Sequence, residues 1–286
     1  MPAIRLETKR VEKPWGRRDL WPGFDAVPEG GQPVGEVWFQ VPGMAVDEPE
    51  LLIKYLFTSE KLSIQVHPDD AAARAAGYPR GKDEAWVVLD AEPHASIAMG
   101  TLRVMDREAL RAAALDGSIE ELVDWKAVKV GDVYYSPAGT VHAIGAGLTL
   151  VEVQQNVDLT YRLYDYGRPR ELHLDEGIAA ANPVPYVATC IARERTRPGH
   201  LILADGPAFV LERWRWPDRG TLTPAPNRPV WLVALTGAGT IDGQPLESGG
   251  AWLVDGPVTM EMGGKCDLLV AYPGAGVVDD LWRPAA

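Results

Sequence analysis

Three segments of the chain carry side chains that can bind a divalent metal ion. In the first segment, Gln65 and His67 stand two residues apart, so both face the same side of a predicted strand. Glu84 opens the next predicted strand, and His142 ends the third segment. Two imidazoles, one carboxylate and one carboxamide oxygen form a donor set that suits zinc, with Mn, Co or Fe as alternatives. Such a set would leave a coordination position for water or substrate.

Taken singly, these residues have simpler interpretations. His67 precedes a proline and could lie in a capped turn, and Glu84 could be a solvated charge at the edge of a sheet. The third segment is more specific, because the pattern G-x5-P-x-G-x2-H that ends at His142 resembles the second metal-binding motif of the cupin superfamily. It departs from that motif at Ala146, where the motif has asparagine. The first motif departs further, with Gln65 in place of a histidine and Glu84 displaced by an insertion.

These departures point to one cupin family. The segments LSIQVHPDD, GKDEAW, PAGTVHAIG, LVEVQQNVDLTYRLYDYGR and ELHL resemble the type I mannose-6-phosphate isomerases (phosphomannose isomerases), in the short bacterial form without the large helical domain. The resemblance runs from about Lys13 to about Ala181, whereas the C-terminal third resembles only the degenerate second cupin of the family. It implies a mainly β fold: a bicupin of two jelly-roll β-barrel domains, with a few short helices in the first half. It also implies one zinc ion per chain on four side chains, Gln65, His67, Glu84 and His142.

The reaction implied by the resemblance interconverts mannose 6-phosphate and fructose 6-phosphate through a cis-enediol. Moving a proton between C2 and C1 requires a fixed acyclic sugar, a base, and positive charge where the enediolate oxygens form. Zinc could act there as a Lewis acid or could orient the sugar hydroxyls, and the sequence leaves both open. Arg162 and Lys82 match the family's catalytic arginine and lysine, and both are expected to bind substrate as well. Glu152 and Asp158 match acidic residues considered for proton transfer.

Several residues have alternatives that the sequence leaves open. Ser63, on the same strand face as Gln65, could donate to the phosphate or a sugar hydroxyl, or could be a buried structural hydroxyl. Arg162 could instead form a surface ion pair with Asp158 or Asp165. Three other histidines are not expected to bind metal: His94 and His200 are predicted to lie in exposed loops, and His173 is predicted to pack or to cap a helix.

Composition narrows the possible partners. The chain has 28 Lys and Arg against 40 Asp and Glu, a formal charge of −12, which argues against nucleic acid or an anionic membrane surface as a partner. A phosphorylated sugar would then have to be captured by a few local cations. The two cysteines, Cys190 and Cys266, make no disulfide framework, and no signal peptide or membrane-spanning stretch is apparent, so a cytoplasmic location is expected. The oligomeric state stays open.

Short β-branched or aromatic runs bounded by Gly, Pro or Asp predict strands along most of the chain, among them 35–41, 51–57, 85–89 and 95–99. Two short helices are predicted within 106–125, the second with a capping box at Ser118 and Glu121, and others at 69–76 and 172–181. The run Asn182-Pro-Val-Pro predicts a boundary between a catalytic metal-binding domain, 1–183, and a second β domain, 184–286. The second domain has a hairpin signal at Asp242-Gly243 but no cluster of metal ligands, so no metal is expected in it.

Two other functions fit the same residues. A cupin oxygenase normally uses three histidines or two histidines and a carboxylate with open iron positions, and Gln65 argues against it. A non-catalytic sugar-binding or regulatory module would bind without turnover. The retention of Lys82 and Arg162 beside all four candidate ligands argues against that alternative.

Overall fold

The computed structural model describes residues 2–45, 47–188, 190, 192–195, 198–216, 218–237 and 239–285. In these residues the fold is mainly β with a few short helices, as predicted; it has four sheets and four helices. The helices all lie in the first half: α1 (Asp70–Ala75), α2 (Arg107–Asp116), α3 (Ile119–Leu122) and α4 (Leu174–Ala180). None of the described helices has the length and apolar character needed to cross a membrane.

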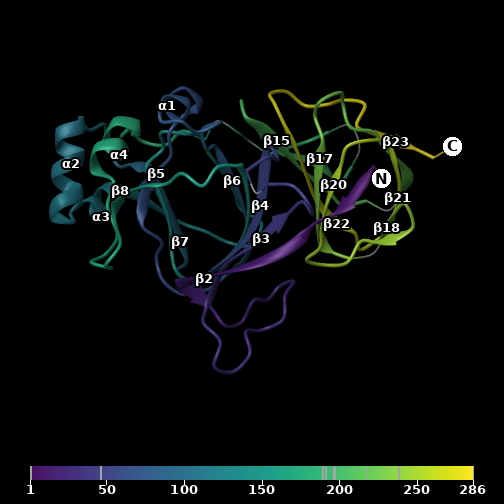
Figure 1. The fold of residues 1–286 in the computed structure, drawn as a ribbon, viewed down its shortest axis with the longest axis horizontal. Helices are drawn as coiled ribbons and strands as arrows, with labels where there is room; N and C mark the ends of the chain where they lie inside the picture. The colour runs from purple at the N-terminus through teal and green to yellow at the C-terminus, as the bar shows by residue number, and fades with distance from the viewer. Residues whose placement is uncertain are drawn as a thin grey trace.

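Two antiparallel sheets face each other in the first half. The six-stranded sheet has the order β2 (Glu7–Arg17), β3 (Val34–Gln40), β4 (Leu51–Thr58), β11 (Leu148–Gln155), β6 (Glu84–Ala91) and β9 (Val133–Ser136). The five-stranded sheet has the order β12 (Tyr161–Tyr164), β5 (Ile64–Val66), β10 (His142–Ile144), β7 (Ser96–Thr101) and β8 (Val123–Ala127). Helices α2, α3 and α4 cover the outer face of the five-stranded sheet (Figure 1).

The second half also contains two sheets. The seven-stranded sheet has the order β1 (Ala3–Arg5), β20 (Ala251–Val254), β17 (Val230–Thr236), β22 (Asp267–Pro273), β15 (Phe209–Trp214), β14 (His200–Asp205) and β13 (Arg193–Glu194). The five-stranded sheet has the order β19 (Gln244–Pro245), β18 (Gly239–Ile241), β21 (Val258–Met262), β16 (Asp218–Leu222) and β23 (Trp282–Pro284). Strand β1 comes from the N-terminus and pairs with β20, so the first residues of the chain complete a sheet of the second half.

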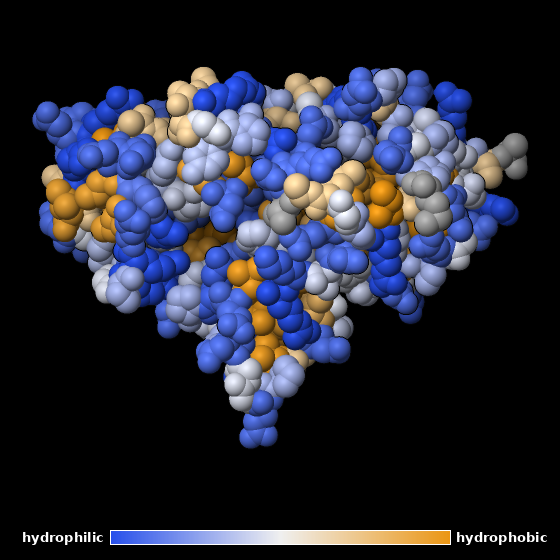
Figure 2. Space-filling model, in the orientation of Figure 1, coloured by the Kyte–Doolittle hydropathy of each residue, from blue (hydrophilic) through white to orange (hydrophobic). Residues whose placement is uncertain are grey.

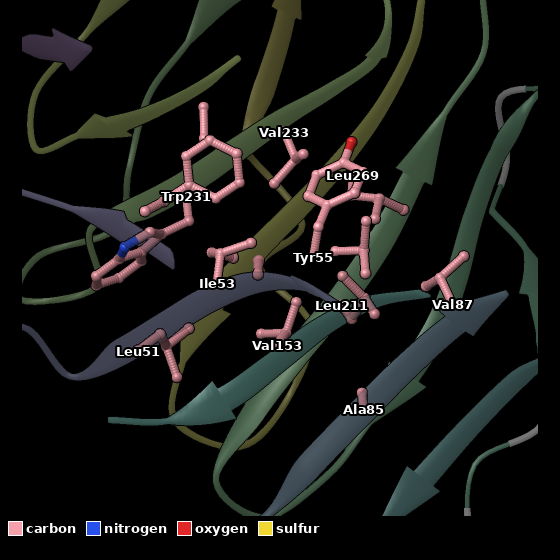
Figure 3. Packing of buried hydrophobic residues seen from close by; sticks show 14 of the residues in the cluster. Leu51, Ile53, Tyr55, Ala85, Val87, Val153, Leu211, Trp231, Val233 and Leu269 are labelled. Atoms are coloured by element: carbon pink, nitrogen blue, oxygen red, sulfur yellow. The ribbon is translucent and has the colours of Figure 1, made fainter. Parts of the chain in front are cut away.

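The two halves pack sheet on sheet. One hydrophobic core joins the six-stranded sheet to the seven-stranded sheet; Figure 3 shows Ile53 and Tyr55 of β4 facing Leu211 and Leu269 of the second half. Burying side chains of this size contributes about 1.5–3 kcal/mol each. On the face shown in Figure 2, hydrophilic residues predominate and hydrophobic ones gather only in small patches. The division of the chain after residue 183 stays a prediction, and β1 crosses it.

Alternation along the central strands places polar side chains in the interior of the first half. In β4, Ile53 and Tyr55 enter the core between the halves, so Lys54 must point between the two sheets of the first half. The same alternation in β6 and β11 directs Glu84, Trp86 and Glu152 to that side. Both faces of these strands are covered, which is why they read as nearly continuous hydrophobic runs.

The local signals for helices and turns were mostly correct. Two helices form within 106–125, and α2 begins at Asp106, whose carboxylate accepts a hydrogen bond from the Ala109 N–H at 2.7 Å. The capping box at Ser118 was wrong. Its backbone is already helical (φ −65°, ψ −11°), not extended as an N-cap requires, and its side chain makes no capping hydrogen bond. The hairpin signal was right, since Asp242 and Gly243 both have positive φ, 47° and 78°.

Candidate active site

A cavity of about 540 Å³ opens between the two sheets of the first half. Its walls come from strands β2, β3, β4, β6 and β11 on one side and β5, β10 and β12 on the other. Seven of the nine predicted site residues line it: Ser63, Gln65, Lys82, Glu84, Glu152, Asp158 and Arg162. The other two, His67 and His142, contact Glu84. The structure therefore brings all nine predicted residues to one place.

His67, Glu84 and His142 form a compact buried cluster. Their candidate ligand atoms all lie within 4.8 Å of one another. The two carboxylate oxygens of Glu84 divide between the histidines, with Oε1 3.3 Å from His67 Nε2 and Oε2 3.4 Å from His142 Nε2. Each of the three side chains is at most 2% exposed, so water does not solvate these atoms.

Hydrogen bonds at the far side of each ring fix how the imidazoles face the cluster. His67 Nδ1 lies 2.9 Å from the Leu159 carbonyl oxygen, and His142 Nδ1 lies 2.9 Å from the Thr140 carbonyl oxygen. A carbonyl only accepts, so Nδ1 must carry the proton and Nε2 presents a lone pair to Glu84. Burial lowers the pKa of His67 to about 4 and also lowers that of His142, which keeps both rings neutral near pH 7.

Two buried atoms of this cluster lack the partner that a bound cation would be. His67 Nε2 and Glu84 Oε2 are buried and have no hydrogen-bond partner. Burial alone would raise the pKa of Glu84, but its interactions with His67 and with Lys82, whose Nζ lies 3.0 Å from Oε1, outweigh burial and hold that pKa well below its usual range. Two neutral imidazole nitrogens facing an ionised carboxylate fit a divalent metal ion, since its charge would satisfy all three groups.

Gln65 lies beside this cluster and next to Arg162. Strand β5 runs between β10 and β12, so Gln65 pairs with His142 on one side and with Arg162 on the other. Its Nε2 lies 3.3 Å from His142 Nε2, and its Oε1 accepts a hydrogen bond from Ser63 Oγ at 3.0 Å. Turning the amide over would aim its oxygen at the cluster while Ser63 accepted from the nitrogen instead.

Arg162 is free of the ion pairs considered for it. Asp165 instead forms ion pairs with Arg168 at 2.9 Å and with Arg170 at 2.6 Å. Among the described residues no acidic side chain lies within 4.0 Å of the Arg162 guanidinium. Arg162 Nη1 lies 3.4 Å from the Glu171 carbonyl and 3.5 Å from His173 Nδ1. The alternative of a surface ion pair was wrong, and the guanidinium faces the cavity with its charge available to a ligand.

The sequence did not predict a second set of charged side chains in the cavity, centred on Lys54 and Glu36. Lys54 Nζ lies 3.3 Å from Glu152 Oε1 and 3.8 Å from Glu36 Oε2, and Lys13 Nζ lies 3.2 Å from Glu36 Oε1. Trp86 Nε1 donates to Glu152 Oε2 at 2.8 Å. Burial alone would lower the pKa of Lys54, but the Glu152 and Glu36 carboxylates outweigh it and raise that pKa.

The signal for these missed residues was present in the sequence. The predicted strand LLIKYLF contains one charged residue, Lys54, in an otherwise apolar run. A strand buried on both faces keeps such a residue only where it is paired, so an isolated charge inside an apolar strand marks a polar interior. Glu36, in VGEVWF, gives the same signal.

The other three histidines had different outcomes. His94 lies in an exposed turn with φ 69°, as predicted. His173 precedes α4 and lines the cavity, where its ring contacts Arg162 and makes no capping bond. The prediction for His200 was wrong: it opens β14, is buried, and contacts Glu212 and Trp214, because the register of β14 with β15 sets it opposite Trp214.

Fold and site together define a mainly β protein whose first half holds a buried potential metal site beside a charged cavity. No protein-family model matches the chain. "Putative mannose-6-phosphate isomerase YvyI" from Bacillus subtilis is 31% identical over 264 residues, 86% of this chain and 83% of that protein. The chain belongs to the mannose-6-phosphate isomerase family.

Other known proteins agree with this assignment. The mannose-6-phosphate isomerase of Streptococcus mutans is 35% identical over 204 residues, a match that spans 67% of this chain but only 62% of that relative. The crystal structure of mannose 6-phosphate isomerase from Bacillus subtilis has a TM-score of 0.79 at 28% identity, covering 94% of this chain and 99% of the other. A phosphomannose isomerase from Salmonella typhimurium, at 16% identity and TM-score 0.72, shares the fold.

Proposed function

We propose that the chain is a zinc-dependent isomerase that interconverts mannose 6-phosphate and fructose 6-phosphate through a cis-enediol. One observation carries the proposal: two neutral histidines and a carboxylate, with partnerless ligand atoms, stand beside a cavity that also presents Lys82 and Arg162. The names of the relatives support the choice of substrate. A cavity of about 540 Å³ is within the size range of small-molecule sites.

His67, Glu84 and His142 would hold the metal ion, with Gln65 as a fourth ligand. Bound there, zinc would stabilise negative charge on the sugar oxygens or orient the sugar hydroxyls. The hydrogen bonds from Nδ1 of each histidine to a backbone carbonyl would keep Nε2 aimed at the ion.

Lys82 and Arg162 would supply positive charge to the substrate. With a formal charge of −12 the protein repels a phosphate dianion at long range, and local cations reverse this only within about one Debye length, roughly 8 Å at physiological salt. Lys82 Nζ, 3.0 Å from Glu84, lies next to the proposed metal position, while Arg162 lies across β5 from His142. Ser63 could add a hydroxyl donor.

Glu152 and Asp158 are the candidates for the proton transfer between C2 and C1. Glu152 is buried and held by Trp86 and Lys54, which fixes its carboxylate in the cavity wall. Asp158 is exposed and lines the same cavity. A base must reach within hydrogen-bond distance of the proton that it removes, and both positions allow this for a sugar in the cavity.

We also propose the finer description of the fold. Two facing sheets in each half support a bicupin with jelly-roll halves, 1–183 and 184–286. The second half would hold no metal, because the one cluster of potential ligands in the described residues is His67, Glu84 and His142.

An assay of fructose 6-phosphate formation from mannose 6-phosphate tests the function. The chain should convert the phosphorylated sugar, and conversion in deuterium oxide should introduce solvent deuterium at carbon 1, as expected when a base carries the proton. Parallel reactions with free mannose test whether the phosphate is required. Binding of mannose 6-phosphate without conversion would instead indicate a sugar-binding module, and iron after anaerobic purification together with oxygen uptake would indicate an oxygenase.

A further inference from the structure

Tyr135 lies where the second half of the chain meets the strand that carries Glu84. Strand β9 pairs with β6, with Tyr135 opposite Ala85 and Ser136 opposite Glu84. The Tyr135 ring packs against Phe209 of β15 at 5.4 Å between centroids. A Cβ at Gly206 would lie 2.1 Å from both Cζ and the hydroxyl oxygen of Tyr135, so the ring occupies space left by the missing side chain. The second half therefore shapes the position of Tyr135.

The Tyr135 hydroxyl reaches Asp83, the residue between Lys82 and Glu84. It donates to Asp83 Oδ2 at 2.5 Å, and the Ala138 backbone N–H donates to Asp83 Oδ1 at 2.8 Å. The Asp83 backbone N–H donates to Gln155 Oε1 at 2.9 Å. Burial and the nearby Asp83 carboxylate raise the pKa of Tyr135, so its hydroxyl keeps the proton that it donates.

Asp83 thus connects two parts of the proposed metal site. Its backbone belongs to the segment that presents Lys82 and Glu84, and its carboxylate binds Ala138 in the loop that leads from β9 to His142. Both Asp83 and Tyr135 are buried, so these hydrogen bonds do not compete with water. Side chains that orient metal ligands from behind commonly change metal affinity when they are replaced.

We propose that the second half of the chain helps to position the metal ligands of the first half. Gly206 and Phe209 of the second half fix the Tyr135 ring, and the Tyr135 hydroxyl fixes Asp83. Asp83 in turn keeps Glu84 and the loop that leads to His142 at the spacing that metal binding requires. Tyr135 and Asp83 are positioning residues in this proposal. The inference rests on the proposed metal site. It does not depend on which sugar the protein uses.

The test measures zinc affinity of the full chain by competition with a chromophoric chelator. Tyr135→Phe keeps the ring and removes only the hydroxyl, and Asp83→Ala removes its acceptor. Each should raise the zinc Kd about tenfold. Because Tyr135 acts through Asp83, the double variant should weaken zinc binding no more than Asp83→Ala alone, and not a hundredfold.

Tyr55→Phe is the matched control, because Tyr55 is a buried tyrosine of the same core between the halves and lies on β4, away from Asp83. Its zinc Kd should equal that of the parent. Gly206→Ala, which changes only the second half, should weaken zinc binding in the same direction as Tyr135→Phe. Thermal unfolding of each variant verifies that the folded protein is being measured.

Three results would overturn the inference: a parental zinc Kd in Tyr135→Phe, independent effects that multiply in the double variant, or equal weakening in Tyr55→Phe. If Gly206→Ala fails to fold, the zinc affinities of the Tyr135 and Asp83 variants alone decide whether the inference holds. A parent chain that binds no zinc would refute the metal site itself, whereas a parent that binds zinc but does not isomerise mannose 6-phosphate would refute the proposed reaction and leave this test intact.

Discussion

The two halves of the molecule each bury a histidine beside a glutamate, and the two pairs differ in how their polar atoms are satisfied. In the first half, His67 Nε2 and Glu84 Oε2 have no hydrogen-bond partner. In the second half, Glu212 contacts His200, accepts from Tyr272 Oη at 2.5 Å and from Trp214 Nε1 at 2.8 Å, and lies 3.4 Å from Arg195 Nη1. Glu212 is fully buried, yet each of its oxygens has partners.

The difference distinguishes a candidate binding site from a structural interaction. A buried polar atom without a partner costs about 1–3 kcal/mol, so a fold that retains two of them side by side gains stability when a ligand satisfies them. A satisfied pair surrounded by Trp214 and Trp216 needs no ligand and fills the interior of its half. The residue types of the two pairs are the same, so only the hydrogen-bond partners of their polar atoms distinguish them.

Removal of one histidine from each half gives the largest expected contrast. His142→Ala should lose bound metal and lower isomerase activity by about 10³-fold, since the metal contributes several kcal/mol to charge stabilisation. His200→Ala should lower stability and leave the metal content per folded chain unchanged. Elemental analysis of both purified variants provides the measurement. Full metal occupancy in His142→Ala would eliminate the first-half site.

Arg162→Ala should separate catalysis from metal binding within the first half. If Arg162 stabilises the enediolate, kcat should fall by about 10²- to 10³-fold, corresponding to about 2.7–4 kcal/mol, with metal content unchanged. If it binds only the phosphate, KM should rise while kcat holds. Arg162→Lys keeps the charge and loses the planar fork, so recovery of kcat in that variant would indicate simple charge placement. Parental kcat and KM in Arg162→Ala would make the residue structural.

Glu212→Gln should affect stability alone. Burial would raise the pKa of Glu212, but its interactions with His200, Tyr272 and Trp214 together outweigh burial and lower the pKa, so the ionised form contributes to the folded state. Replacing the carboxylate should reduce the free energy of unfolding by about 1–3 kcal/mol. Denaturant unfolding measures this, and zinc affinity measured on the same preparation should match the parent. Loss of zinc with retained stability would show that the second-half pair acts on the metal site.

The metal-free chain should lose stability in mild acid because of His67. Its pKa is about 4 when folded and about 6.5 when unfolded, so the unfolded chain binds the proton more readily between these values. The free energy of unfolding should therefore fall by about 1–3 kcal/mol as the pH falls from about 6.5 to about 4. His67→Gln should reduce that slope, while His94→Asn, at an exposed histidine, should not. Equal slopes in all three proteins would contradict the assignment.

Sequence patterns predicted the elements better than their environments. The apolar runs at 51–57 and 85–89 gave correct strands, and Asp106 gave a correct helix start. The environment of His200 was missed because a Pro-Gly turn precedes it, while its burial depends on Trp214 and Glu212, which follow in the next strand. The pairing of β1 with β20 joins residues about 250 positions apart, and no local pattern encodes such a contact.

The candidate site could be anticipated because its motifs are local. Gln65 and His67 stand two residues apart, as do Lys82 and Glu84, and the resemblance of these short segments to one family pointed to all four. In the structure Gln65 lies in β5 and Glu84 opens β6, whereas His67 and Lys82 lie just outside those strands. The missing part was the wall in which Lys54 contacts Glu36 and Glu152, three residues that lie on three separate strands. Asp83 was also missed, since its contacts with Tyr135 and Ala138 follow from the pairing of β6 with β9.

The most direct test of this account measures metal content and isomerase activity on one preparation, before chelation, after chelation and after zinc is restored. The account predicts one zinc ion per chain, loss of mannose 6-phosphate isomerisation when the ion is removed, and recovery when it returns, with His200→Ala following the same course. Undiminished isomerase activity in the verified metal-free chain would contradict it.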